Sequence, residues 1–238
     1  MGVRNASPQA TVDDGYTVWN ALWSKLKHLS ETPWRSPERN EVGPTLPLLS
    51  HVELRAAAAS FKPRTASGVD ALLPTHFAWL SDSLLDRVGD LYAGFEEHGC
   101  WPKQVSTSIV HLIPKAAGGR RLVGLLASLV RLWERARKPV MREWQNTCKR
   151  TYNWMERGRG SERSVWAQTL YEEAAASSGK VTASIFLDLL KAFEQVVLAN
   201  VWRSGLKHRM PQRVLTLALE ACAFSHRLSL QRGDFKCC

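Results

Sequence analysis

The sequence predicts a mixed fold of the α+β class, in which helices flank a few single strands. Three observations support this prediction. Most apolar residues recur at helical spacing, three short runs have the composition of strands, and no internal repeat is visible in the 238 residues. With 45% hydrophobic residues, the chain is long enough to build one large core or two small ones.

The first fifty residues predict a helix and then a linker. Residues 14 to 29 carry apolar side chains at helical spacing, whereas residues 31 to 49 contain four prolines and show no periodicity. Ser50 and Glu53 then have the spacing of a capping box, in which each side chain accepts a hydrogen bond from a free amide of the first turn. We expect a helix from there to about Phe61.

The next hundred residues predict a loop, a helix, a strand and a long basic helix. The loop covers residues 62 to 74, the helix ends near Gly99, and the strand covers residues 108 to 113 before Pro114. After a turn at Gly118-Gly119, a helical pattern extends from about Leu125 to Thr147. Pro139 should break or kink it.

The last part of the chain predicts a second strand-and-helix region. Residues 152 to 163 resemble a loop, and residues 165 to 177 a helix. Residues 181 to 187 are β-branched and apolar, as expected of a buried strand that ends at Asp188. Helical spacing continues from Ala192 to Val201, Pro211 begins another helix, and residues 226 to 231 predict a final strand.

The charge of the chain is strongly basic and unevenly distributed. The formal net charge is +10, and residues 115 to 163 alone contain thirteen Lys and Arg against four Glu. An excess of this size favours a polyanionic partner such as nucleic acid or an anionic membrane surface. The alternative interpretation is the solvated basic face of an ordinary helix.

Cysteine spacing and segment hydropathy indicate an intracellular protein. The five cysteines form no CxxC pair and have no His partners at zinc spacing, so we expect neither disulfides nor a zinc site. The sequence shows no signal peptide and no apolar run of membrane-spanning length. We therefore expect a nuclear or cytoplasmic protein that is not secreted and has no membrane partner.

Asp188, at the end of the apolar run SIFLDLLKAFEQV, has two interpretations. It could cap the following helix by accepting hydrogen bonds from its first amides. It could also bind Mg²⁺, because carboxylates at strand ends hold the ion that contacts substrate phosphates. A magnesium site usually needs a second carboxylate, so Asp188 alone is insufficient.

Four blocks in the order of a known family bear on this choice. TASGVDALLP at 65–74 looks like "K-x-x-G-x-D-G-I-P", and residues 106–140 resemble "I-P-K … R-P-I-S-L … K-x-x-E". NWMERGRGSERSVWAQ at 153–168 is similar to "G-F-R-x-G-R-S", and FLDLLKAFEQV at 186–196 to "F-x-D-x-x-K-A-F-D". Together they resemble the reverse transcriptases of non-LTR retrotransposons, over roughly three quarters of the chain.

The resemblance implies a partial right-hand polymerase: helix-rich fingers and the start of the palm sheet. Residues 1–49 would be an N-terminal helix and linker, 50–180 fingers-like, and 181–238 the start of the palm. By the same resemblance Asp188 would be the first catalytic, metal-binding aspartate, with the Leu189 carbonyl as a further oxygen. Phe193 would exclude the 2′-hydroxyl of the incoming nucleotide, a role compatible with a core aromatic. Lys115 and Arg121 would contact its triphosphate.

The implied reaction is nucleotidyl transfer from a dNTP to a primer 3′-hydroxyl on an RNA template, with Mg²⁺ as the cofactor. The basic segment would then follow the nucleic-acid backbone, and the expected contacts are Arg131, Arg157, Arg159 and Arg163.

The sequence also departs from the family pattern. No Asp-Asp pair follows Asp188, Leu122 stands where the family has Pro, and Glu194 replaces an Asp. We therefore expect a chain truncated before the Asp-Asp hairpin and the thumb, weak Mg²⁺ binding, and no polymerase activity from this chain alone. The alternatives are an RNA- or DNA-binding remnant without chemistry, or a fragment whose unpaired palm strand favours aggregation. A different enzyme with a lone carboxylate lacks a supporting His, Ser or Cys constellation.

Overall fold

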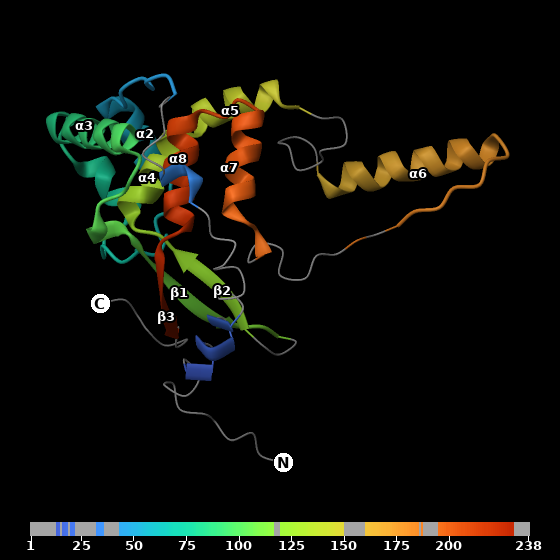
Figure 1. Cartoon of the computed structure of the whole chain (residues 1–238), viewed down its shortest axis with the longest axis horizontal. Coiled ribbons are helices and arrows are strands. Elements are labelled where there is room, and N and C mark those ends of the chain that lie inside the picture. Colours follow the sequence, from blue (N-terminus) through green and yellow to red (C-terminus); the bar gives the residue numbers. More distant parts are fainter. Residues whose placement is uncertain are drawn as a thin grey trace, which may run out of the picture.

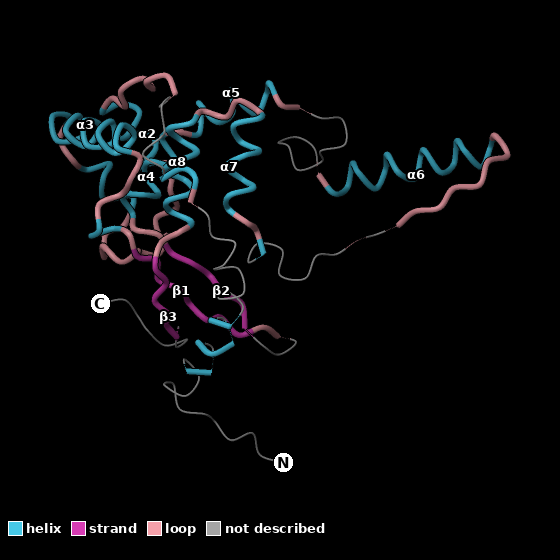
Figure 2. Tube along the Cα trace, viewed as in Figure 1, coloured by secondary structure: helices cyan, strands magenta, loops and turns pink. Residues whose placement is uncertain are grey.

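The computed structural model describes residues 13–14, 16–18, 20–21, 32–35, 43–116, 120–149, 160–185, 187 and 195–230. Within these ranges the helices and strands occupy separate parts of the molecule, as the cyan and magenta segments of Figure 2 show. The strands form one small sheet, and most helices gather beyond one end of it (Figure 1). This separation confirms the α+β class predicted from the sequence.

The bounds of the elements follow in chain order. They are η2 (Pro33–Arg35), α2 (His51–Ala59), η3 (Pro74–Trp79), α3 (Asp82–His98), η4 (Lys103–Val105), β1 (Thr107–Pro114), β2 (Arg120–Leu125), α4 (Ser128–Ala136), α5 (Lys138–Thr147), α6 (Ser161–Ser177), α7 (Leu198–Lys207), α8 (Gln212–Cys222) and β3 (Ser225–Leu230). The described residues between 13 and 21 are also helical, in agreement with the predicted first helix.

The described sheet has the order β2-β1-β3 and mixes two kinds of pairing. β1 pairs antiparallel with β2, from Ile109 opposite Leu125 to Pro114 opposite Arg120, and parallel with β3. Every second residue of β1 is buried, namely Ser108, Val110 and Leu112. This alternation confirms the strand predicted at residues 108 to 113, and β3 confirms the strand predicted at the end of the chain.

The sequence did not predict β2. Its residues Arg120–Leu125 are exposed or half-buried without alternation, and they begin with two arginines, so they lack the pattern of a half-buried strand. The strand forms because it pairs antiparallel with β1 at six positions. Hydrogen bonding to β1, and not local propensity, therefore determines its structure.

The main core joins α2, α3, α4 and α8. Leu54, Leu85, Tyr92, Leu132 and Leu217 are fully buried members of one apolar cluster. The predicted capping box is confirmed, because the Ser50 amide donates to Glu53 Oε2 at 3.0 Å and the Ser50 hydroxyl accepts from the Glu53 amide. The cluster includes residues from both sides of position 180, and the division of the chain into domains stays a prediction.

A second cluster shows that the predicted linker takes part in the core. Trp34 lies in η2 and is only 1% exposed, packed with Trp202, Leu215 and Leu219. Its indole Nε1 donates to Glu220 Oε1 at 2.7 Å, and the adjacent Arg35 donates to both oxygens of that carboxylate at 2.6 and 2.7 Å. The prediction of a linker over residues 31 to 49 is therefore wrong at η2, because proline spacing gives no information on tertiary burial.

The predicted break at Pro139 is confirmed. α4 ends at Ala136 and α5 begins at Lys138, with Pro139 in the first turn, where its missing N–H costs no hydrogen bond. The predicted start at Leu125 is wrong, because that residue ends β2 and α4 begins at Ser128. α6 begins at Ser161, so Arg163 lies in its first turn and not in the predicted loop.

The buried strand predicted at residues 181 to 187 is wrong at every described position. Residues 181–185 and 187 have no strand structure, and Val181, Ile185 and Leu187 are 98, 86 and 86% exposed. A buried strand needs hydrogen-bonding neighbours and a covering layer. No described strand pairs with this segment. The composition of this exposed run is the one that would favour aggregation if the chain were a fragment with an unpaired palm strand.

Candidate nucleic-acid interface

The β1–β2 hairpin brings together the two cations predicted to bind a triphosphate. Lys115 follows β1 directly, and Arg121 lies in β2 opposite Ile113, two residues before Lys115. The paired positions end at Pro114 opposite Arg120, so Lys115 lies one residue beyond them. Because side chains alternate along a strand, Arg120 and Arg121 belong to opposite faces of β2. Lys115 and Arg121 are both exposed. The hairpin therefore presents two exposed cationic side chains at one end of the sheet.

The loop that resembles the first family block is fixed against the start of α4. A Cβ at Gly68 would lie 2.2 Å from the Leu126 carbonyl oxygen, so only glycine fits this contact. Asp70 Oδ2 accepts hydrogen bonds from the Ser128 amide at 2.6 Å and the Leu129 amide at 3.3 Å. α4 has no cap of its own at Ala127, so Asp70 caps it from another part of the chain. The first two blocks thus form one unit.

Arg131, predicted to contact nucleic acid, is partly used inside the protein. Its Nη1 donates to the Ala66 carbonyl at 2.6 Å, and its guanidinium lies 5.6 Å from the Phe61 ring centroid. Arg135 lies closer to the same ring, at 4.2 Å, and its Nη1 donates to the Ser60 hydroxyl at 3.2 Å. Neither arginine is neutralised by these contacts, because the acceptors carry no formal charge. Both remain half-buried cations.

Arg137, by contrast, points into the core. Its guanidinium donates to both oxygens of Glu96 at 2.6 and 2.7 Å, and the Trp133 indole donates to the same carboxylate at 2.7 Å. The side chains of Arg137 and Glu96 are 4 and 3% exposed. One of the thirteen cations counted in the basic segment is therefore paired and inaccessible to any partner.

The remaining predicted site residues divide into two groups. Arg163 is exposed in α6, which extends away from α4 in Figure 1, so the structure does not bring it near Arg131. The other five lie outside the described residues: Arg157, Arg159, Asp188, Leu189 and Phe193. In the described ranges no three His, Cys, Asp or Glu side chains are placed to hold a metal ion. The role of Asp188 as a magnesium ligand stays a prediction.

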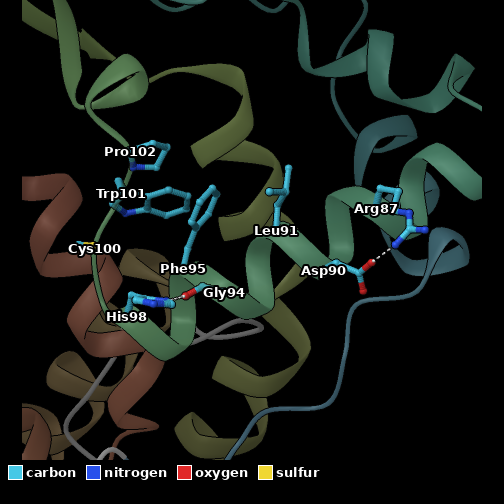
Figure 3. A pocket seen from close by; sticks show the side chains of 9 residues that line it. All are labelled: Arg87, Asp90, Leu91, Gly94, Phe95, His98, Cys100, Trp101 and Pro102. Carbon is cyan, nitrogen blue, oxygen red and sulfur yellow. Dashed lines mark hydrogen bonds and ion pairs between the residues drawn. The ribbon is translucent and has the colours of Figure 1, made fainter.

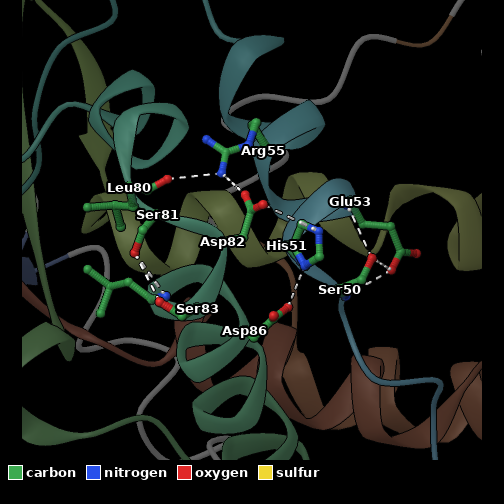
Figure 4. Close-up of polar contacts among 10 residues, drawn as sticks. Ser50, His51, Glu53, Arg55, Leu80, Ser81, Asp82, Ser83 and Asp86 are labelled. Carbon is green, nitrogen blue, oxygen red and sulfur yellow. Dashed lines mark hydrogen bonds and ion pairs between the residues drawn. The ribbon is translucent and has the colours of Figure 1, made fainter.

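A polar cluster between α2 and α3, missed by the sequence analysis, fixes the start of α2 (Figure 4). His51 Nδ1 lies 2.9 Å from Asp86 Oδ1, and the His51 amide donates to the same oxygen at 3.0 Å. These contacts lower the pKa of Asp86 below its usual range. Arg55 pairs with Asp82 one turn earlier in α3. The sequence signal was the i,i+4 spacing of the two aspartates, but it does not identify their partner.

An apolar hollow of about 660 Å³ lies along α3 (Figure 3). Phe95 and Trp101 line it with ring centroids 5.6 Å apart. Its arginine, Arg87, is 3.4 Å from Asp90, and His98 contacts the Gly94 carbonyl. The lining therefore offers no unpaired cation to a phosphate, and we do not include it in the interface.

No protein-family model matches the chain, and no curated protein sequence matches it either. Of the described helices, none is both long enough and apolar enough to cross a membrane. Functional inference therefore depends on the residues and geometry given above.

Proposed function

We propose that this chain forms the fingers and the start of the palm of a reverse transcriptase like those of non-LTR retrotransposons. The observation that carries the proposal is the hairpin, which has Lys115 and Arg121 exposed at the same end of the sheet. Two fixed cations suit a triphosphate, because they offset the charge on its phosphoryl groups. The docking of the Gly68 loop on α4 supports the proposal further, since it joins two of the four resembling blocks.

In the family reaction a primer 3′-hydroxyl attacks the α-phosphate of a dNTP, and pyrophosphate leaves. Mg²⁺ supplies charge stabilisation in that reaction, and Asp188 would be one of its ligands. Lys115 and Arg121 would hold the triphosphate oxygens. Because the sequence has no Asp-Asp pair after Asp188, we expect this chain by itself to bind a nucleotide without extending a primer.

The test is binding of a fluorescent dNTP to the whole chain, with matched variants of the hairpin. The double variant Lys115→Gln/Arg121→Gln should weaken binding by about tenfold or more, because each lost hydrogen bond involves a charged group. Arg120→Gln is the control, since Arg120 is exposed in the same strand but belongs to the opposite face. Equal losses in both variants, or no binding by the unmodified chain, would overturn the proposal.

A second candidate function is nucleic-acid binding without chemistry. The exposed cations of the hairpin and of α5 favour it, because they need no magnesium site to attract a polyanion. This function predicts salt-dependent RNA binding and no dNTP binding. A primer-extension assay on the same preparation separates both functions from an active polymerase, which would produce elongated primer.

A further inference from the structure

Four cations on α4 and α5 repeat at helical spacing and form a stripe. Arg131 and Arg135 are four residues apart in α4, and Lys138 and Arg142 are four residues apart in α5, an interval that places side chains on one face of a helix. We call these four residues the basic stripe. Arg137 lies within the same stretch but is turned into the core.

The basic stripe borders two adjoining hollows. Arg131, Arg135 and Lys138 line one of about 430 Å³, together with Lys62. Arg135, Lys138 and Arg142 line the other, of about 340 Å³. Lys62, Lys138 and Arg142 are exposed. The cations of the stripe thus surround a continuous concave surface.

The balance of charge in the hollows is positive. Five cations line the two hollows, and the carboxylates among their lining residues are Glu134 and Glu53. Glu53 already accepts hydrogen bonds from the Ser50 amide and hydroxyl in the capping box. The phenyl ring of Phe61 is 9% exposed beneath two arginines, so it offers no open face for stacking a base. Recognition here would be of phosphate and not of bases.

We propose that the basic stripe, with Lys62, binds the phosphodiester backbone of a nucleic acid without regard to its sequence. The site is separate from the hairpin: the six residues of β2 extend about 20 Å away from the hairpin end, and α4 follows beyond the other end of that strand (Figure 1). The proposal stands on the placement of these side chains and does not require nucleotide binding at Lys115 and Arg121.

A nucleic acid suits this surface better than a membrane. A helix that binds in a membrane interface presents a broad apolar face beside its cations. The large apolar side chains of α4 and α5 are buried or half-buried, and none of them is exposed. The hollows also favour a narrow chain of phosphates over a flat layer of headgroups.

The experiment measures binding of a fluorescein-labelled 20-nucleotide oligouridylate to the whole chain over a series of salt concentrations. In the double variant Lys138→Gln/Arg142→Gln, the negative slope of log affinity against log salt should become shallower by about 1.4. Each lost phosphate contact on a single strand contributes about 0.7 to this slope. Lys103→Gln/Lys207→Gln removes the same charge from two exposed positions elsewhere and should leave the slope nearly unchanged.

Three further measurements make the result decisive. The charge-preserving variant Lys138→Arg/Arg142→Lys should retain the slope, and circular dichroism should show the same fold in all variants. Equal slopes for the stripe variant and the control would overturn the proposal. The proposal would also be overturned if the stripe variant Lys138→Gln/Arg142→Gln lost binding to phosphatidylserine vesicles while its binding of oligouridylate stayed unchanged. The dNTP assay on hairpin variants is independent, so its failure leaves this result interpretable.

Discussion

The molecule contains two clusters of the same composition in two different environments. In the Glu96 cluster, Glu96 accepts hydrogen bonds from Trp133 and Arg137; in the Glu220 cluster, Glu220 accepts from Trp34 and Arg35. The hydrogen-bond lengths are the same in the two clusters: 2.7 Å from the indole, and 2.6 and 2.7 Å from the guanidinium. The exposed fractions differ, since Arg137 is 4% exposed and Arg35 is 52% exposed.

This difference shows that hydrogen-bond geometry alone does not determine how much an ion pair contributes. Removing one partner of a buried pair leaves a charge that neither water nor protein solvates, whereas a half-exposed arginine can turn to water. The Glu96 cluster also has a wider structural role. Arg137 joins α4 to α5 and donates to the Pro47 carbonyl ahead of α2, so it links three parts of the core.

The largest expected effect is the loss of the buried carboxylate. Glu96→Gln should lower the free energy of unfolding by about 3–5 kcal/mol, because it leaves Arg137 buried without a counter-charge. Glu220→Gln is the matched control and should cost about 1 kcal/mol, since Arg35 is half-exposed. Urea unfolding followed by tryptophan fluorescence measures both. Equal losses would contradict the role assigned to exposure.

The second prediction replaces both charges of the buried pair. Glu96→Met/Arg137→Met should recover most of the stability lost in Glu96→Gln, because no unpaired charge remains. A deficit of about 1–3 kcal/mol should persist, since the Trp133 indole loses its acceptor in the core. A double variant as unstable as the single one would show that the cluster acts through packing and not through charge.

The third prediction concerns salt. Raising the salt concentration from 0.1 to 1 M shortens the screening length from about 10 to about 3 Å. The destabilisation caused by Glu220→Gln should therefore shrink by less than about 1 kcal/mol, while that caused by Glu96→Gln stays the same. The urea assay at both salt concentrations provides the measurement. If the destabilisation caused by Glu96→Gln also changed with salt concentration, water would have to reach the buried pair.

The smallest effect is expected at the exposed carboxylates around α2. Hydrogen bonds from Ser50 lower the pKa of Glu53, with a further contribution from the charge of Arg137, and hydrogen bonds from His51 lower that of Asp86. Since their pKa values are lower in the folded chain, their stabilisation is fully present above about pH 4 and is lost as the pH falls through the folded values.

Variants that cannot titrate measure this contribution. Glu53→Gln and Asp86→Asn should each reduce the loss of stability between pH 6 and pH 3, measured by urea unfolding at a series of pH values. Asp90→Asn, on the exposed side of α3, is the control. An unchanged acid response in both variants would show that the capping box and the His51 contact contribute nothing to it.

The sequence predicted the helix that carries the carboxylate in each cluster, but not the partners of that carboxylate. The helices α3 and α8 follow from apolar spacing, the Gly99 signal and Pro211, so the elements that carry Glu96 and Glu220 were predicted. Their partners were not. Arg137 was counted among the thirteen cations of residues 115 to 163 and Trp34 in a linker, because the direction of a side chain depends on neighbours distant in sequence.

The candidate interface shows the same division. Lys115 and Arg121 were selected from a resemblance, and the pairing of β1 with β2 brings them together even though β2 has no strand pattern of its own. Among the basic residues, the i,i+4 and i,i+3 spacing of Arg131, Arg135, Lys138 and Arg142 was present in the sequence. The structure distinguishes these cations from Arg137 between them, because they line the hollows beside α4 and α5 whereas Arg137 is buried against Glu96.

By itself, the sequence determined the α+β class, the presence of most helices, the capping box at Ser50 and the concentration of positive charge after Lys115. These features follow from local periodicity, capping and composition, which act over a few residues. The tertiary structure decided the pairing of β2, the burial of Trp34 and Arg137, and the exposure of residues 181–185 and 187. These depend on contacts between distant segments, because burial and strand pairing require a partner that local sequence does not specify.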